Sequence, residues 1–321
     1  MPRAVIVHPS CFGFVGALFI DGAGTVIIHN STFKNNTSYK DGGMAVVYNA
    51  TLLVSKGFIY NNTAARYGGT VAAFQTRGIT FEETEFNNNR ANFDGGAVYL
   101  YESRLKASDC DFLYCVADRM GGAIASNMSS SIKLVHSRFA TNSAGTSGGV
   151  VSTEVNSIAL INNSTLLHNK ACGDGGVAYV EYKSTVILNN SRFINNSATG
   201  KGGVLFVQKQ SIVLVNYTAI HNSTAISGGM LYAIKNTSTT VSNSIFSYIK
   251  AKQGRGGVIC AKKGSSVTMS NSSFNFNMAK TFGGVVSVHY SSDCLLTIVS
   301  FIVTSLVMMV ECLMAILSAA L

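Results

Sequence analysis

Short apolar runs return at a fixed spacing along this chain. Each run follows a pair of glycines, and successive pairs begin 26 to 28 residues apart. A fixed period of this length is typical of solenoids and other repeat arrays. A degenerate further copy lies at Val15–Ile20. The complete pairs begin at Gly42, Gly68, Gly95, Gly121, Gly148, Gly175, Gly202, Gly228, Gly256 and Gly283.

An apolar landmark precedes each glycine pair by 9 or 10 residues. If each repeat is one coil, equivalent side chains stack about 4.8 Å apart and form an interior column. The landmark is Leu166 and Ala219 in two copies. In the others it is phenylalanine: Phe33, Phe58, Phe86, Phe112, Phe139, Phe193, Phe246 and Phe274.

Asparagine recurs on both sides of the landmark. Asparagine tolerates left-handed backbone, and stacked amides can bond along a column of identical residues. We therefore expect structural ladders here and sharp turns with φ > 0 at the glycine pairs. Three positions before the landmark lie Asn163, Asn190, Asn216, Asn243 and Asn271. Three positions after it lie Asn36, Asn61, Asn89, Asn142, Asn169, Asn196, Asn222 and Asn277, with Cys115 and Ile249 in the remaining copies.

About 27 residues are too few for a pair of packed helices with loops, but they fit three short strands and three bends. Alternating apolar residues such as Val186 and Leu188 favour strands. The composition agrees, because only 12% of residues are charged while glycine is abundant and proline nearly absent. A leucine-rich repeat is the rival architecture, but its Leu-x-x-Leu-x-Leu pattern is missing. We predict an all-β, single-stranded parallel β-helix of about 10 to 11 coils over residues 1–292.

Two signatures alternate at this period. One is G-G-[AV]-[VI], as at Gly95–Val98, Gly121–Ile124 and Gly256–Ile259, and the other is F-x-x-N, as at Phe193–Asn196. The alternation resembles the passenger repeats of chlamydial polymorphic outer-membrane proteins, and related β-helix repeat proteins of some eukaryotes, within the pectin-lyase-like superfamily. The resemblance covers roughly residues 5–290. It implies a right-handed β-helix and a surface-displayed adhesin or autotransporter passenger.

A second, apolar segment is expected at residues 293–321. Leu295–Leu321 holds one charged residue, Glu311, and exceeds the roughly 20 residues that a transmembrane helix needs. We expect a membrane-spanning helix there. Two alternatives remain: a cleaved lipid-anchor signal, and a last degenerate coil, because Ser300 and Phe301 fall one period after Ser273 and Phe274.

The carboxylates of two neighbouring repeats offer the only constellation with catalytic potential. In the predicted stack Glu83 lies on Asp109 and Glu85 lies on Asp111. Like-charged pairs one rung apart could raise a pKa, hold Ca²⁺ or act as an acid and base. The alternative is a solvated acidic patch eased by nearby arginines. We expect no cofactor and no metal, since no metal-ligand, nucleophile or phosphate-loop motif is present.

The remaining features bear on compartment and partners. The net charge of +9 is interpreted as spread over the chain without a basic block, so no nucleic-acid partner is expected. The seven cysteines are too scattered for a disulfide framework. Packed free thiols are expected, with a local Cys110–Cys115 bridge as the alternative. N-x-[ST] sequons mark possible glycosylation at Asn35, Asn61, Asn195 and Asn222.

Three functions remain open. The first is a non-enzymatic cell-surface structural or adhesion protein, anchored in the membrane at its C-terminus and binding an unknown protein or glycan. The second is a carbohydrate-active lyase or hydrolase of the pectin-lyase type. The third is a piece of a larger surface receptor-like protein, because His8–Phe12 resembles His29–Phe33 and the chain begins inside a coil.

Overall fold

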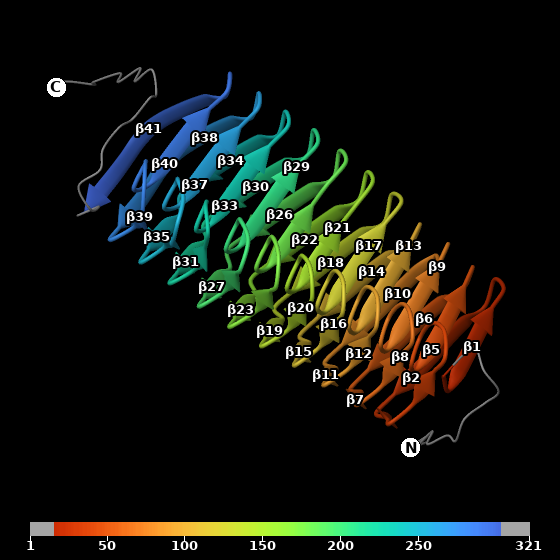
Figure 1. The fold of residues 1–321 in the computed structure, drawn as a ribbon. Coiled ribbons are helices and arrows are strands. Elements are labelled where there is room, and N and C mark those ends of the chain that lie inside the picture. Colours follow the sequence, from red (N-terminus) through yellow and green to blue (C-terminus); the bar gives the residue numbers. More distant parts are fainter. Residues whose placement is uncertain (1–15, 303–321) are drawn as a thin grey trace.

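The computed structural model describes residues 16–302, and these form a rod of stacked parallel coils (Figure 1). Strands pair only in parallel, each with the equivalent strand about one period away, as in Phe86 with Phe112 and Phe112 with Phe139. The rod has about 11 coils, counted by the strands of its most regular sheet. The predicted all-β parallel β-helix is thereby confirmed.

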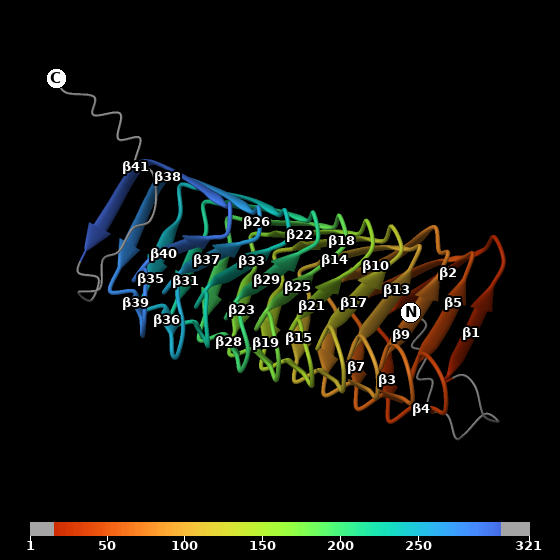
Figure 2. The same cartoon turned by 45° about the horizontal axis from the view of Figure 1, so that its top comes forward.

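One coil illustrates the path of the chain. It runs through β13 (Val98–Tyr101), β14 (Arg104–Ser108), β15 (Asp111–Leu113) and β16 (Val116–Ala117). A loop then leads to Gly121-Gly122 and the next coil. Figure 2 shows the equivalent strands of successive coils lying side by side along the rod.

The strands form three sheets within the described residues. The eleven-stranded sheet comprises β1 (Leu18–Asp21), β5 (Ala45–Tyr48), β9 (Val71–Phe74), β13, β17 (Ile124–Asn127), β21 (Val151–Thr153), β25 (Ala178–Val180), β29 (Leu205–Gln208), β33 (Leu231–Ile234), β37 (Ile259–Lys262) and β40 (Val286–His289). The ten-stranded sheet comprises β4 (Thr37–Ser38), β8 (Thr63–Ala64), β12 (Arg90–Ala91), β16, β20 (Ser143–Ala144), β24 (Lys170–Ala171), β28 (Ser197–Ala198), β32 (Thr224–Ala225), β36 (Lys250–Ala251) and β39 (Met278–Ala279).

The twenty-stranded sheet takes two strands from most coils, separated by a one-residue bend. It comprises β2 (Thr25–His29), β3 (Thr32–Lys34), β6 (Thr51–Ser55), β7 (Phe58–Tyr60), β10 (Gly78–Glu82), β11 (Glu85–Asn87), β14, β15, β18 (Ser131–Val135), β19 (Arg138–Ala140), β22 (Ile158–Asn162), β23 (Thr165–Leu167), β26 (Thr185–Asn189), β27 (Arg192–Ile194), β30 (Ile212–Asn216), β31 (Ala219–His221), β34 (Ser238–Ser242), β35 (Ile245–Ser247), β38 (Ser266–Asn275) and β41 (Asp293–Ile302).

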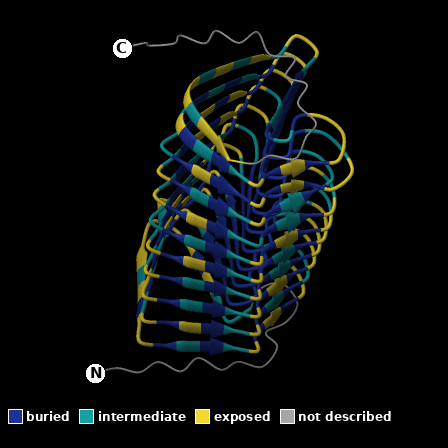
Figure 3. Ribbon diagram, turned by 90° about the vertical axis from the view of Figure 1, so that its left-hand side faces the viewer, coloured by how far each residue is buried: buried dark blue, intermediate teal, exposed yellow. Residues whose placement is uncertain are grey.

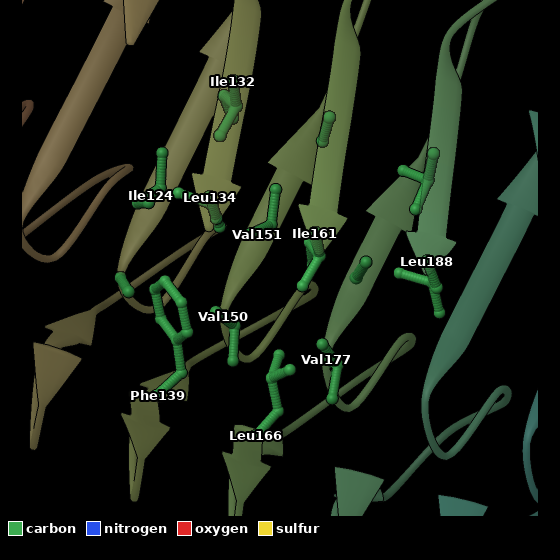
Figure 4. Packing of buried hydrophobic residues seen from close by; sticks show 14 of the residues in the cluster. Ile124, Ile132, Leu134, Phe139, Val150, Val151, Ile161, Leu166, Val177 and Leu188 are labelled. Carbon is green, nitrogen blue, oxygen red and sulfur yellow. The ribbon is translucent and has the colours of Figure 1, made fainter. Parts of the chain in front are cut away.

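Alternation along the strands gives the rod its core. In β26, Val186 and Leu188 are buried while their neighbours are partly exposed. Equivalent apolar residues from each coil meet in the interior, as Figure 4 shows for Leu134, Ile161 and Leu188. In Figure 3 buried positions line the inside of the coils and exposed ones lie at the outer bends. Each coil therefore buries its apolar side chains against its neighbours.

The phenylalanine column exists, with a shift of one residue in two coils. Phe86, Phe112 and Phe139 are fully buried and stack with ring centroids 4.4 and 4.8 Å apart. Phe33, Phe193, Phe246, Phe274 and Leu166 occupy the same column. The assignment of Phe58 is wrong, because its side chain is 53% exposed and Ile59 pairs with Phe33 and Phe86. Ile220 likewise replaces Ala219.

One asparagine column is buried at the bend after the landmark. The Asn169 amide nitrogen donates to the Asn196 side-chain oxygen at 3.0 Å and to the Phe139 carbonyl at 3.0 Å. The Asn169 oxygen accepts the backbone N–H of Asn142. The column consists of Asn36, Asn62, Asn89, Asn142, Asn169, Asn196 and Asn277, so Asn62 replaces the expected Asn61, and Ser223 replaces Asn222.

The asparagines before the landmark lie at the surface. Asn163, Asn190, Asn243 and Asn271 have φ of 43 to 49° and form the one-residue bend of the twenty-stranded sheet. Their amides bond at the surface, as Asn271 does to Asn243. Asn216 is not at this bend: it ends β30, and Tyr217, with φ of 46°, takes the bend position.

The glycine pairs form turns as expected. The first glycine of every pair has φ between 60 and 71°. The second has no room for a side chain, because a Cβ on Gly203 would lie 2.1 Å from the carbonyl oxygen of Gly229 in the next coil. Glycine is therefore required at both positions, at the first for its conformation and at the second for close backbone stacking.

The C-terminal end differs from the expected helix. Residues Asp293–Ile302 form β41, which pairs in parallel with β38 and aligns Ser300 with Ser273 and Phe301 with Phe274. The last-coil alternative is thus correct for these residues, and the β-helix passes the expected boundary at residue 292. Residues 16–302 contain no helix with the length and apolar character needed to cross a bilayer. The remainder of the predicted segment, 303–321, lies outside the described residues.

Candidate functional site

The predicted acidic patch lies on the twenty-stranded sheet and is balanced by bases. Glu85 and Asp111 are aligned on neighbouring rungs, as expected. Glu83 and Asp109 sit at the bends, with side chains 63% and 61% exposed.

Each carboxylate except Glu85 has a basic partner. Lys56 lies 3.9 Å from Glu83, and His136 lies 3.9 Å from Asp109. Arg138 donates twice to Asp111, at 2.9 and 3.4 Å, and this contact raises the pKa of Arg138. Exposed pairs of this kind contribute roughly 0–1 kcal/mol. The geometry is that of a solvated ladder of ion pairs rather than an acid–base dyad.

The four glycosylation candidates share one structural position. Asn35, Asn61, Asn195 and Asn222 lie at the second bend of their coils with φ between 49 and 57°. The bend turns these side chains outward: three are exposed and Asn195 is half-buried. Some are tied together, since Asn222 donates to Asn195 at 2.7 Å. The bend position makes the acceptors accessible, and their modification stays a prediction.

The structure brings together a different set of carboxylates, on the outer face of the eleven-stranded sheet. Val98 and Leu100 belong to the core, so Tyr99 and Tyr101 point to the opposite face. Asp94 lies in the loop ahead of this strand and is 8% exposed. Its Oδ1 accepts the backbone N–H of Met120 at 3.1 Å and lies 3.7 Å from Arg119. Burial raises the pKa of Asp94, although Arg119 acts against this.

Glu154 belongs to the same face two coils later. It follows β21, and its Oε1 accepts a hydrogen bond from Ser152 at 3.0 Å. Burial raises the pKa of Glu154, and the negative charges of Asp94 and Glu181 raise it further. A carboxyl group that is reluctant to ionise is suited to proton donation or to a hydrogen bond with a polar ligand.

Glu181 lies one coil beyond Glu154 in a denser network. The Tyr179 hydroxyl donates to its Oε2 at 2.8 Å, and Lys209 pairs with its Oε1. Gln208 in turn donates to the Tyr179 hydroxyl at 2.6 Å. Burial raises the pKa of Tyr179. Asp94, Glu154 and Glu181, with Arg119, Tyr99 and Tyr179, are called the carboxyl cluster below.

The sequence does not predict the carboxyl cluster, because its members are far apart in the chain. One signal was available: Glu154 and Glu181 are a single period apart, and each directly follows a short strand. Another is aspartate directly before the glycine pair, at Asp41, Asp94 and Asp174. The acids that lie close together in the sequence belong to the exposed patch around Glu83 and Asp111 instead.

The described part of the chain holds no grouped metal ligands, and Cys110 and Cys115 are buried. No three His, Cys, Asp or Glu side chains there are grouped so as to bind a metal ion. Cys110 and Cys115 are free thiols and not a bridge. Burial raises the pKa of each to about 12, so the reactive thiolate is scarce at neutral pH.

Comparison with known proteins agrees with the geometry. The Chlamydia polymorphic membrane protein repeat matches residues 187–208. No curated protein and no solved structure matches. The right-handed β-helix region matches residues 16–193, more than half of the chain. The chain therefore belongs to the right-handed β-helix family.

Proposed function

We propose that this protein is a non-enzymatic, adhesion-type β-helix rod displayed at a cell surface. It would be attached to the membrane by its apolar C-terminal sequence and would bind a protein or glycan partner through the outer face of the eleven-stranded sheet. The match of residues 187–208 to a repeat of a Chlamydia membrane protein supports a surface location.

The observation that carries the proposal is the contrast between faces of the rod. The bends of the twenty-stranded sheet repeat asparagine from coil to coil, and the ion pairs of this sheet are confined to the coils between Lys56 and Arg138. The outer face of the eleven-stranded sheet changes along the rod and holds partly buried carboxyls and tyrosines. Individual side chains in a protected position give a binding face its specificity.

Surface display and attachment can be tested on intact cells. An epitope-tagged full-length chain should be accessible to antibody without permeabilisation and should fractionate with membranes. A variant ending at Ile302 should be released into the medium. A full-length chain found only inside the cell would contradict the proposed location, and a truncated chain still held on the membrane would contradict the proposed anchor.

A second function is favoured by one observation in the carboxyl cluster. Asp94 and Glu154 are carboxyls of raised pKa on one face, near Arg119, and this resembles the acid, base and cation set of a carbohydrate-active enzyme. Incubation with polyuronides and neutral polysaccharides, followed by ultraviolet and reducing-end assays, tests it. Activity lost in Glu154→Gln but kept in the exposed control Glu83→Gln would favour the enzyme and overturn the non-enzymatic proposal.

A further inference from the structure

The charge of the chain is divided unevenly along the rod, contrary to the expectation of an even spread. From Met1 to Glu181 there are 13 basic and 13 acidic residues. Between Glu181 and Asp293 there are eleven lysines and arginines and neither aspartate nor glutamate. The C-terminal coils therefore carry the whole net positive charge. The period of the repeat does not explain this, since both halves repeat the same motif.

Three of these lysines and arginines, together with His289, converge on the outer face of the eleven-stranded sheet. The Lys201 and Lys262 ammonium groups lie 5.0 and 5.6 Å from the centre of the Tyr232 ring. The Arg255 guanidinium lies 2.9 Å from His289 Nε2 and 4.8 Å from the Phe282 ring. Lys201, Arg255, Lys262 and His289 are called the basic cluster below.

Unlike their counterparts in the N-terminal half, Lys201, Arg255 and Lys262 form no ion pair with any of the described residues. There, Arg66 pairs with Asp41 and Arg119 with Asp94. In residues 16–302, no carboxylate lies within salt-bridge distance of the charged groups of Lys201, Arg255 or Lys262. Asp174 accepts the backbone N–H of Lys201, whose ammonium lies over Tyr232 instead.

The cations of the basic cluster also act together on a thiol beneath them. Cys260 is fully buried on β37, and burial raises its pKa to about 11. Lys262, Arg255 and Lys201 all oppose that rise. All three positive charges thus lie close enough to the buried Cys260 thiol to act on it. Like charges gathered in this way repel one another, and a bound anion would relieve the repulsion.

The spacing of the cations favours an extended anion lying along the rod. Lys201 and Arg255 precede glycine pairs two coils apart, which is about 10 Å along the axis. Lys262 and His289 are aligned on neighbouring rungs. Arginine and lysine at such intervals match the oxyanions of a linear polymer, and guanidinium can bond one group through two N–H donors.

The aromatic residues favour a sulfated glycan over a single-stranded nucleic acid. Tyr179, Phe206 and Tyr232 stack on one another at 5.5 and 5.6 Å with planes within 4° of parallel. Phe206 lies between the other two rings, and both lysines lie over Tyr232. Nucleic-acid binding without sequence preference uses free aromatic faces on which bases stack, whereas these rings mainly contact one another and the lysines.

We propose that the basic cluster on the C-terminal coils binds a linear sulfated polysaccharide. This names a partner class for the proposed surface-binding function, and its biological meaning rests on that function. The binding itself can be measured in solution. A charged polymer would cross several coils, with its sulfate groups against Lys201, Arg255 and Lys262.

The test uses the full-length chain and a labelled heparin oligosaccharide of defined length, with binding measured by fluorescence anisotropy at several salt concentrations. The triple variant Lys201→Gln/Arg255→Gln/Lys262→Gln should bind at least about tenfold more weakly and show a shallower salt dependence. The control Arg192→Gln/Lys250→Gln/Lys280→Gln removes equal charge from exposed positions on β27, on β36 and directly after β39. It should change affinity less than about threefold.

Three outcomes would overturn the proposal. They are equal losses in the two triple variants, equally tight binding of an unsulfated polyuronide, and tighter binding of a single-stranded oligonucleotide. Unchanged circular dichroism and melting temperature show that the variants are folded. Adhesion to cells is scored separately: heparin binding without cell attachment would contradict the proposed function and leave the sulfated-glycan site standing.

Discussion

The buried and surface asparagine columns repeat with the same period but make different bonds. In the buried column, Asn169 bonds the next amide, a backbone carbonyl and a backbone N–H of neighbouring coils. In the surface column, Asn190 bonds one neighbouring amide, that of Asn163, and otherwise faces solvent. Repetition of a residue therefore does not fix its energetic role. Burial decides it, because a buried polar group without a partner is costly.

Breaking the buried column should have the largest effect. Asn169→Leu would remove the acceptor of the Asn142 backbone N–H, one of the two hydrogen bonds of the Asn142 amide, and one donor to the Phe139 carbonyl. We expect a loss of about 3 kcal/mol in the free energy of unfolding. Urea and thermal unfolding measure it. A change below about 1 kcal/mol would mean that water enters the column and that burial does not separate the two columns.

The gap in the surface column offers a gain. Tyr217 occupies the left-handed bend with φ of 46°, and its side chain is 60% exposed. Left-handed backbone costs an ordinary residue about 1–2 kcal/mol and asparagine less. Tyr217→Asn should raise the free energy of unfolding by about 1 kcal/mol. The control Tyr217→Gly separates the two contributions, since glycine relieves the strain without an amide. Destabilisation in both variants would show that ring packing outweighs the strain.

The gap in the buried column allows a repair. Cys115 lies between Asn89 and Asn142 and has no amide to continue the ladder. The Asn89 amide donates to the Ile59 carbonyl in the preceding coil, and the Asn142 side-chain oxygen accepts the Cys115 backbone N–H. Cys115→Asn should restore an amide on this rung and raise the free energy of unfolding by about 1 kcal/mol. Thermal unfolding measures the gain. Cys115→Ser, whose hydroxyl is too short to bridge two rungs, should not show it, and equal stabilisation by serine would contradict a ladder effect.

The sequence predicted the period, the strands and the glycine turns, but its register slipped by one residue in two coils. The recurrence of phenylalanine predicts Phe58 inside the rod and Ile59 outside. It therefore also predicts Asn61, instead of Asn62, in the buried asparagine column. Inward alternation decides the register instead: Ile59 lies between Phe33 and Phe86, while Phe58 faces solvent. Since Asn-Asn pairs fill both a buried and a surface position, residue identity cannot distinguish them.

The carboxyl cluster and the basic cluster are harder to predict because the residues of each come from several coils. Asp94 reaches the face from a loop, while Glu154 and Glu181 reach it from the ends of strands two and three coils away. The sequence shows their spacing but not that loop and strand share a face. The uneven charge needs no structure at all, only a count along the chain. Its convergence around Tyr232 does need the coordinates.

The smallest expected effect sharpens the comparison between the columns most. Asn190→Gly removes the amide bond to Asn163 and keeps a residue that accepts φ of 49°. We expect a change of less than about 0.5 kcal/mol in the free energy of unfolding, as for most surface substitutions. Asn190→Ala, which lacks both the amide and the left-handed preference, should cost about 1 kcal/mol. If glycine costs as much as alanine, the surface amide ladder itself stabilises the rod, and the two columns differ in degree rather than in kind.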